Sequence, residues 1–317
     1  MRDALLRDLA ELTGETQQYQ VMTMHDARLT PSVYAKKSMV VAAVDFKKVF
    51  KKALKQADLV WLIAPETEGT LLALTELCLA AEEKEGGIIF LGCGYDATLI
   101  GTSKTLSFEA LQAADIHTLP VFGGEDLMQQ DFFEGLLQLR VDKWVAKPED
   151  GAACEGIQYF DSLYDLRDFL KQDAQYLHYL AQPFQAGITA SLSIICRDGK
   201  GWLLSCNTQH IEFDGSQFKL TGITVNGMQP YWQRFETLAR KVAKMLPDAL
   251  GYVGVDVIVD TENDTILVID INPRLTSSYA GLRKAIGHNP AKIILDCLLA
   301  PNFKMPVLQK NRVEVVL

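Results

Sequence analysis

Two segments decide the fold: Gly-Val-Asp-Val-Ile-Val-Asp at residues 254–260, and Leu-Val-Ile-Asp-Ile-Asn-Pro-Arg at residues 267–274. Both are apolar except at a few acidic and amide positions, and a polar turn separates them, so they predict a β-hairpin. Side chains alternate between the two faces of a strand. Asp270 and Asn272 are therefore expected on one face, with Asp256 opposite them on the paired strand.

This face of the hairpin predicts a metal site. Two carboxylates and an amide oxygen would repel one another unless a cation lay between them. Hard oxygen ligands of this kind suit Mg²⁺, which completes its shell with water and substrate phosphates, and they also accept Mn²⁺. The predicted ligands are Asp256, Asp270 and Asn272. The alternative is an edge pair whose polar groups are satisfied by turns and water.

The residues that follow the hairpin extend the predicted site. Arg274 is close enough in sequence to reach the same pocket, and a planar guanidinium can bind two oxygens of a phosphate or acyl phosphate. Ser277, Ser278 and Tyr279 come next and are candidates to line a small polar substrate site. A surface arginine and an ordinary polar loop are the alternatives.

Two lysines are candidates for binding phosphate. Lys147 ends the predicted strand 143–147 and precedes a loop of small residues at 148–156, whose backbone N–H groups could approach phosphate oxygens. No Gly-Lys-Ser/Thr opens a helix here, so this is not a Walker loop, and a plain hairpin loop is the alternative. Lys104, at the start of a predicted helix, is the second candidate.

An apolar strand that leaves into Gln-Pro-Phe-Gln at residues 182–185 could present its backbone to an adenine edge. Gln182 and Phe184 are the candidate adenine-binding residues. The alternative for Phe184 is an ordinary core aromatic.

In this order, the pieces resemble the ATP-grasp superfamily over residues 99–299. The resemblance implies that the family's two nucleotide lysines correspond to Lys104 and Lys147, and its adenine hinge to residues 182–185. It also implies that the family's metal-binding acids and Asn-Pro-Arg motif correspond to Asp256, Asp270, Asn272 and Arg274. Two positions depart from the family pattern. Gln182-Pro183 stands where glutamates are common, and Ala153 stands where glycine is frequent.

The expected fold class is α/β, an ATP-grasp fold preceded by an α/β lobe with a parallel sheet. Apolar runs at 59–64 and 88–92 flank a predicted helix at 70–83, which is typical of such a lobe. We expect three divisions: an N-terminal lobe (1–98), an ATP-grasp domain (99–306) and a tail (307–317). The ATP-grasp domain is expected to consist of a small lobe that covers the nucleotide (99–180) and a C-terminal lobe that binds metal and carries out catalysis (181–306). The lobe opens with a helix rather than a strand, so we expect an upstream strand and turn to complete it.

Within the superfamily, residues 147–156, 270–279 and 65–69 are similar to the tyramine–glutamate ligase group of methanofuran biosynthesis. This resemblance implies an ATP- and Mg²⁺-dependent carboxylate–amine ligase that acts through an acyl phosphate and joins glutamate to tyramine or tyrosine. Another ATP-grasp amino-acid ligase and a non-catalytic nucleotide-binding module are the alternatives.

Composition narrows the class of protein. The 31 basic and 40 acidic residues leave a net charge of −9 and no basic stripe of the kind that nucleic-acid binders carry. The lysines of residues 47–55 are expected to form a solvated helix face. No apolar run reaches the roughly 18 residues of a membrane span, and no Gly-x-Gly-x-x-Gly follows a strand as in dinucleotide-dependent dehydrogenases. Six cysteines without a Cys-x-x-Cys pair predict reduced thiols and a cytoplasmic protein. The resemblance implies small-molecule partners, glutamate and an aromatic amine, and a homodimer stays open.

Overall fold

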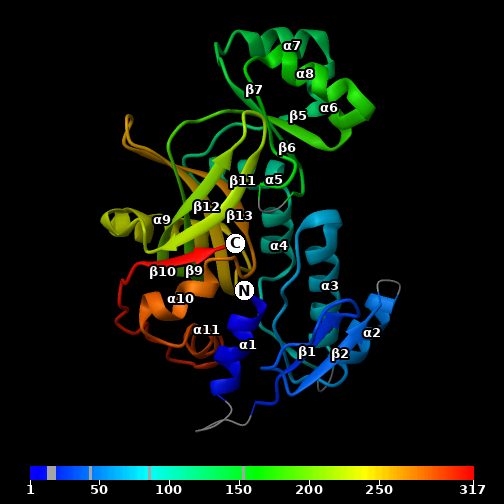
Figure 1. Cartoon of the computed structure of the whole chain (residues 1–317), viewed down its shortest axis with the longest axis vertical. Coiled ribbons are helices and arrows are strands. Elements are labelled where there is room, and N and C mark those ends of the chain that lie inside the picture. Colours follow the sequence, from blue (N-terminus) through cyan, green and yellow to red (C-terminus); the bar gives the residue numbers. More distant parts are fainter. Residues whose placement is uncertain (13–18, 43–44, 85–86, 152–153) are drawn as a thin grey trace.

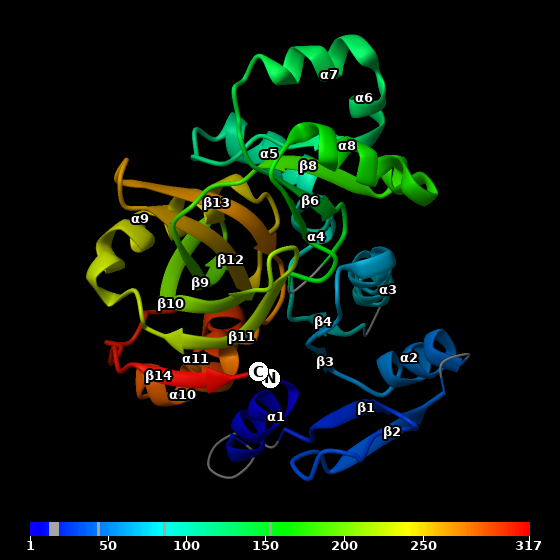
Figure 2. The ribbon, with the colours of Figure 1, turned by 45° about the horizontal axis from the view of Figure 1, so that its top comes forward.

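The computed structural model describes residues 1–12, 19–42, 45–84, 87–151 and 154–317. Within these ranges the chain forms an α/β fold with an N-terminal lobe, a small lobe and a large C-terminal lobe (Figures 1 and 2). Helices α4 (Tyr95–Thr102) and α5 (Lys104–Ala113) connect the N-terminal lobe to the small lobe. The predicted fold class is confirmed.

The N-terminal lobe contains two separate parallel strand pairs. Strand β1 (Met22–Asp26) pairs with β2 (Lys37–Val41), and β3 (Leu59–Val60) pairs with β4 (Ile89–Phe90). Helices α2 (Phe46–Leu54) and α3 (Thr70–Glu82) accompany them, with the short turn η2 (Thr67–Gly69) before α3. The parallel pairing was predicted, whereas β2 was not. The upstream strand stays a prediction.

The small lobe is a four-stranded antiparallel sheet with helices on one side. The strand order is β5 (Phe122–Gly123), β8 (Tyr179–Pro183), β6 (Trp144–Pro148) and β7 (Gln158–Phe160). Its helical segments are α6 (Gly124–Met128), α7 (Gln130–Leu137), α8 (Leu163–Lys171) and η3 (Gln172–Leu177). Fully buried Trp144, Phe133 and Leu166 form the centre of its core.

The C-terminal lobe is a six-stranded antiparallel sheet. Its order is β13 (Thr265–Asn272), β12 (Gly251–Asp260), β9 (Ile188–Arg197), β10 (Lys200–Phe213), β11 (Phe218–Val225) and β14 (Val313–Val316). The turn η4 (Gln229–Tyr231) leads into α9 (Trp232–Met245), which packs on one face of the sheet, while α10 (Tyr279–Ile286) and α11 (Pro290–Leu299) cover the other. The prediction of a separate tail at 307–317 is corrected here, because β14 pairs with β11 and is part of the sheet.

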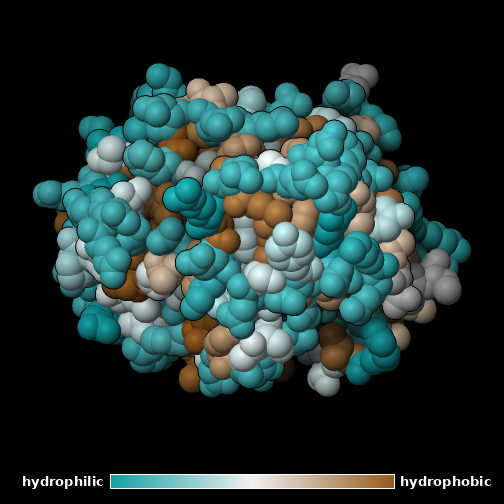
Figure 3. All heavy atoms as spheres, turned by 90° about the horizontal axis from the view of Figure 1, so that it is seen from above, coloured by the Kyte–Doolittle hydropathy of each residue, from teal (hydrophilic) through white to brown (hydrophobic). Residues whose placement is uncertain are grey.

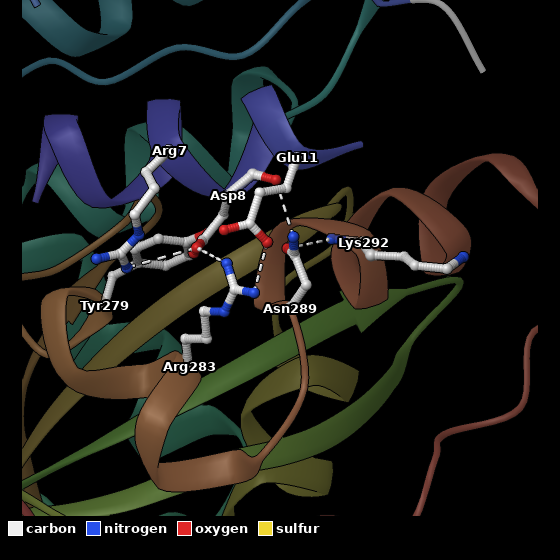
Figure 4. Close-up of polar contacts among 7 residues, drawn as sticks. All are labelled: Arg7, Asp8, Glu11, Tyr279, Arg283, Asn289 and Lys292. Atoms are coloured by element: carbon white, nitrogen blue, oxygen red, sulfur yellow. Dashed lines mark hydrogen bonds and ion pairs between the residues drawn. The ribbon is translucent and has the colours of Figure 1, made fainter. Parts of the chain in front are cut away.

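Helix α1 (Arg2–Glu11) also departs from the expected division, because it packs on the C-terminal lobe. Leu5 lies in the same buried core as Leu282 and Ile294 of α10 and α11. Asp8 has no exposed surface, and Figure 4 shows it between side chains of α1 and α10. An acidic residue without exposure needs such partners, since burying an unpaired charge is unfavourable.

Hydrophilic residues predominate on the face seen from above, and hydrophobic residues form small separate groups there (Figure 3). The five lysines of residues 47–55 are exposed, as predicted for a solvated helix face. No helix in the described ranges is long and apolar enough to cross a membrane.

Candidate active site

The β12–β13 hairpin brings the three predicted metal ligands together. Asp256 pairs directly with Asp270, and Gly254 pairs with Asn272 on the same two strands. The Asn272 Nδ2 donates a hydrogen bond to Asp256 Oδ2 at 3.1 Å. The register shifts just after Asp256, and such bulges commonly redirect a side chain next to a functional site.

Asp256 lies in an environment that disfavours its negative charge. Burial raises the pKa of Asp256 to about 7, and the charge of Asp270 acts in the same direction. Asn272 opposes this shift, as does Gln209 of β10, whose Nε2 donates to Asp256 Oδ1 at 2.8 Å. Sequence reasoning missed Gln209, since a single glutamine in a strand carries no signal of its own.

This donor set fits a hard divalent cation such as Mg²⁺. The two carboxylates and the amide oxygen share one hairpin, and a cation would remove their repulsion. No group of three or more His, Cys, Asp or Glu side chains in the described ranges is arranged to hold a metal. A cation at the hairpin would therefore need further ligands from substrate phosphates and water.

Lys147 lies near Lys104 and the two aspartates of the hairpin, and the binding of phosphate by both lysines stays a prediction. Lys147, on β6, is 9% exposed, and burial lowers its pKa to about 8 while the nearby charge of Asp270 raises it. The charge of Lys104 lowers the same pKa, which places both lysines within electrostatic reach of each other. Lys104 Nζ donates to the backbone oxygens of Glu149 at 3.3 Å and Gly151 at 3.1 Å.

The loop after Lys147 is fastened to the start of α5. The Glu149 carboxylate accepts hydrogen bonds from Ser103 Oγ at 2.5 Å and from the Thr105 backbone N–H at 3.3 Å. Sequence reasoning did not identify this role for Glu149. Ala153, which departs from the family pattern, lies outside the described residues.

The predicted hinge lies where β8 leaves the small lobe. Gln182 is buried, and its Nε2 lies 3.4 Å from the Leu119 backbone oxygen. Phe184 stacks on Phe218 and meets the edge of Tyr159, so it belongs to an aromatic cluster between the small lobe and the tip of the β10–β11 hairpin. The adenine contacts of Gln182 and Phe184 stay predictions.

Arg274 is held by a carboxylate from the N-terminal lobe. Its Nη2 donates to Glu66 Oε2 at 2.5 Å, and its Nη1 donates to the Leu275 backbone oxygen at 3.1 Å. Its Nη2 also lies 3.5 Å from Asn272 Oδ1, which places the guanidinium beside the predicted metal ligands. Burial raises the pKa of Glu66, and Arg274 opposes that shift.

The predicted substrate role of two residues is corrected here, because their side chains are buried and form hydrogen bonds within the protein. Ser278 is 1% exposed and lies within hydrogen-bonding distance of Tyr252, Ser193 and Thr276. Tyr279 is also buried, and its hydroxyl donates to Asp8 Oδ2 at 3.2 Å (Figure 4). Ser277 is half-buried, and its substrate role stays a prediction.

Family models and curated relatives match most of this chain. The family model of an ATP-grasp domain matches residues 102–278, and that of a pre ATP-grasp 3 domain matches residues 19–97. The tyramine–L-glutamate ligase of Methanocaldococcus fervens is 29% identical over 72% of this chain and 62% of its own length. That of Methanocaldococcus jannaschii is 30% identical over 71% of this chain and 58% of its own length. The chain thus spans about three-fifths of the length of these relatives.

Solved structures share the fold at low sequence identity. The biotin carboxylase of Campylobacter jejuni, in complex with β,γ-ATP, superposes with a TM-score of 0.75 at 14% identity, over 97% of this chain and 71% of its own. The L-amino acid ligase of Bacillus licheniformis gives a TM-score of 0.68 at 13% identity, over 93% of this chain and 71% of its own. Together with the family models, which match more than half of the residues, these findings assign the fold and the family: the chain belongs to the ATP-grasp family.

Proposed function

We propose that this protein is an ATP- and Mg²⁺-dependent carboxylate–amine ligase that joins glutamate to tyramine or tyrosine. The observation that carries the proposal is the meeting of two lysines and an arginine around a pair of aspartates, on segments far apart in sequence. Positive groups of this kind complement a triphosphate, while the aspartates complement the cation that accompanies it.

The reaction needs positioning and charge neutralisation more than covalent help from the protein. A substrate carboxylate oxygen attacks the γ-phosphorus of ATP, ADP leaves, and an acyl phosphate forms. The amine nitrogen then attacks the acyl carbon, and the C–O bond to phosphate breaks. Phosphate departs with that electron pair, and the nitrogen gives up its surplus protons to the surroundings.

Each side chain has a defined task in this scheme. Lys104 and Lys147 would bind phosphate oxygens, and Arg274 would stabilise charge on the transferring phosphoryl group. Asp256, Asp270 and Asn272 would hold Mg²⁺, which when bound neutralises charge on the β- and γ-phosphates. Lys147 is suited to its task because it is buried, and a charge-assisted hydrogen bond is stronger where water is excluded.

The substrates are proposed from the relatives. Both are named tyramine–L-glutamate ligase, and the alignments cover 72% and 71% of this chain. We therefore propose glutamate as the acyl donor and the primary amine of tyramine, or of tyrosine, as the acceptor.

The test is ADP formation with ATP, Mg²⁺, glutamate and a panel of amines, with the product identified by mass. Amide formation that requires glutamate and a phenolic amine supports the proposal. Amide formation with unrelated amines, and none with tyramine or tyrosine, would replace the substrates but leave a ligase. ATP binding without ADP formation, under any substrate combination, would instead favour a non-catalytic nucleotide-binding module.

A further inference from the structure

Within the described ranges, Glu66 is a buried carboxylate with one of its two oxygens left without a partner. Its side chain is 5% exposed, and Arg274 binds only one of its oxygens, Oε2. The other oxygen, Oε1, is buried and has no hydrogen-bond partner among the described residues. Buried polar atoms are rarely left unsatisfied, and such an atom beside a reaction site indicates that a donor is still to come.

Arg274 is equally incomplete. Its Nε is buried without an acceptor in the described part of the chain, and the Nη2 that reaches Glu66 also points toward Asn272. Arg274 must release this carboxylate if the same N–H groups are to bind a phosphoryl group. Glu66 would then be a buried anion without a cation, which is strongly unfavourable. A second cation in the place of the guanidinium would remove this cost.

The position of Glu66 favours a substrate as that cation. Two residues of the turn η2 that follows Glu66, Glu68 and Gly69, have a left-handed backbone, with φ of 54° and 64°. The Glu68 N–H donates to Asp150 Oδ2 at 2.7 Å, in the loop that follows Lys147. The Glu66 side chain therefore lies against Arg274, and its turn is fastened to the loop that follows Lys147, so Glu66 lies close to where the phosphates and the substrates are proposed to bind.

We propose that Glu66 binds the ammonium group of a substrate in exchange for Arg274, which is thereby released toward the phosphoryl group. This rests on the proposed ligase function and adds a recognition residue to it. Two substrates carry an ammonium group: the α-ammonium of glutamate and the amine of the phenolic acceptor. The recognised chemistry is the same, so the experiment must separate the two sources.

The experiment measures binding, so it does not depend on turnover. Calorimetry with Mg²⁺ and a non-hydrolysable ATP analogue compares two pairs of ligands: glutamate with glutarate, and tyramine with 4-ethylphenol. Each pair differs only in the ammonium group. We expect the native protein to prefer the ammonium-bearing member of one pair by about tenfold or more, the equivalent of one charge-assisted hydrogen bond. The Glu66→Gln variant should lose that preference, and the pair affected identifies the source.

The matched control is Glu68→Gln, which removes the same charge from an exposed residue of the same loop and should keep the preference. Glu66→Asp keeps the charge on a shorter side chain; it should retain part of the preference, and it replaces Glu66→Gln if that variant does not fold. Equal weakening of both members of a pair would show a structural role and overturn the inference. So would a native protein that distinguishes neither pair, whatever the assay of amide formation shows.

Discussion

At the scale of single residues, Asp256 and Asp270 are two like charges that repel each other and that a bound cation would stabilise. They are direct partners across β12 and β13, and the pKa of Asp256 is raised to about 7 by burial and by its neighbour. Such a pair is unfavourable alone and favourable around a cation. Amide donors from Gln209 and Asn272 hold Asp256 in place.

We predict that Asp270→Asn lowers ligase turnover by at least about 100-fold without unfolding the protein. The change is nearly isosteric but removes one of the two charges that would bind the proposed cation. Turnover measured over a range of Mg²⁺ concentrations, beside thermal unfolding, checks it. Glu262→Gln, an exposed change in the turn of the same hairpin, is the control and should keep full turnover. Near-native turnover of Asp270→Asn at matched Mg²⁺ would show that the metal assignment is wrong.

Lys147 leads to a pH prediction. Its pKa is lowered to about 8 because burial disfavours the charged form, so in the free protein it loses its proton above pH 8. ATP favours the charged form, and binding above that pH must therefore take up a proton. We expect ATP affinity to fall about fivefold between pH 8 and pH 9.

Calorimetry in buffers of different ionisation enthalpy measures this proton uptake directly. The Lys147→Met variant serves as the control, because it should bind ATP about 10- to 100-fold more weakly with little change over the same pH range. Equal pH dependence of the two proteins would show that another group is responsible.

At the scale of elements, the docking of α1 depends on one buried carboxylate. Asp8 Oδ1 accepts from Arg283 at 3.1 Å and Oδ2 from Tyr279 at 3.2 Å, while the Asp8 backbone oxygen accepts from Asn289 at 2.8 Å (Figure 4). Asn289 also caps α11 through Lys292 N–H. One residue of α1 is thus tied to both helices beneath the sheet.

We predict that Asp8→Ala lowers the free energy of unfolding by about 2–4 kcal/mol, because it leaves the buried Tyr279 hydroxyl without its acceptor and removes one of the two carboxylates bound to the Arg283 guanidinium. This is somewhat less than a fully buried pair would lose, since Arg283 is one-third exposed. Urea unfolding provides the measurement. Glu11→Gln, which alters the exposed partner of the same arginine, should change stability by less than about 1 kcal/mol. Similar losses for both variants would contradict the role given to Asp8.

The elements that the sequence predicted well are those with local signals. The β12–β13 hairpin is marked by two apolar runs and a polar turn, and its register follows from alternation. The positions of α1 and β14 could not be read in this way, because their partners lie roughly 270 and 90 residues away. The same limit applies to Glu66, whose partner Arg274 is 208 residues distant. Ser278 and Tyr279 were assigned to the substrate because polarity reveals that a side chain needs a partner but not on which face it finds one.

At the scale of the whole molecule, an aromatic cluster joins the small lobe to the large sheet. Phe213 and Phe218, at the tip of the β10–β11 hairpin, lie with ring centroids 4.8 Å apart, and Tyr159 of β7 meets Phe213 at 5.2 Å. The Tyr159 N–H also donates to the Ser216 backbone oxygen at 2.8 Å. These contacts hold the lobe that carries Lys147 over the sheet that carries the aspartates.

We predict that Phe213→Ala raises the KM for ATP about two- to tenfold with little change in kcat, because an aromatic pair contributes about 0.5–1.5 kcal/mol to holding the lobes together. Limited proteolysis without nucleotide should cut the small lobe of this variant faster. Phe132→Ala, a partly exposed aromatic of the small lobe outside the cluster, should behave like the native protein. An unchanged KM for Phe213→Ala would show that the cluster does not hold the lobes.

The docking of α1 also has a consequence for how the chain matures on the ribosome. Residues 2–11 are synthesised long before α10 and α11, which cover Leu5 and bind Asp8 and begin only at residue 279. The sheet itself waits for β14 at residues 313–316. The small lobe, whose strands all lie between residues 122 and 183, can fold while synthesis continues. A nascent chain stalled near residue 270 would therefore contain a folded small lobe and an undocked α1, whose exposed leucines a chaperone could bind.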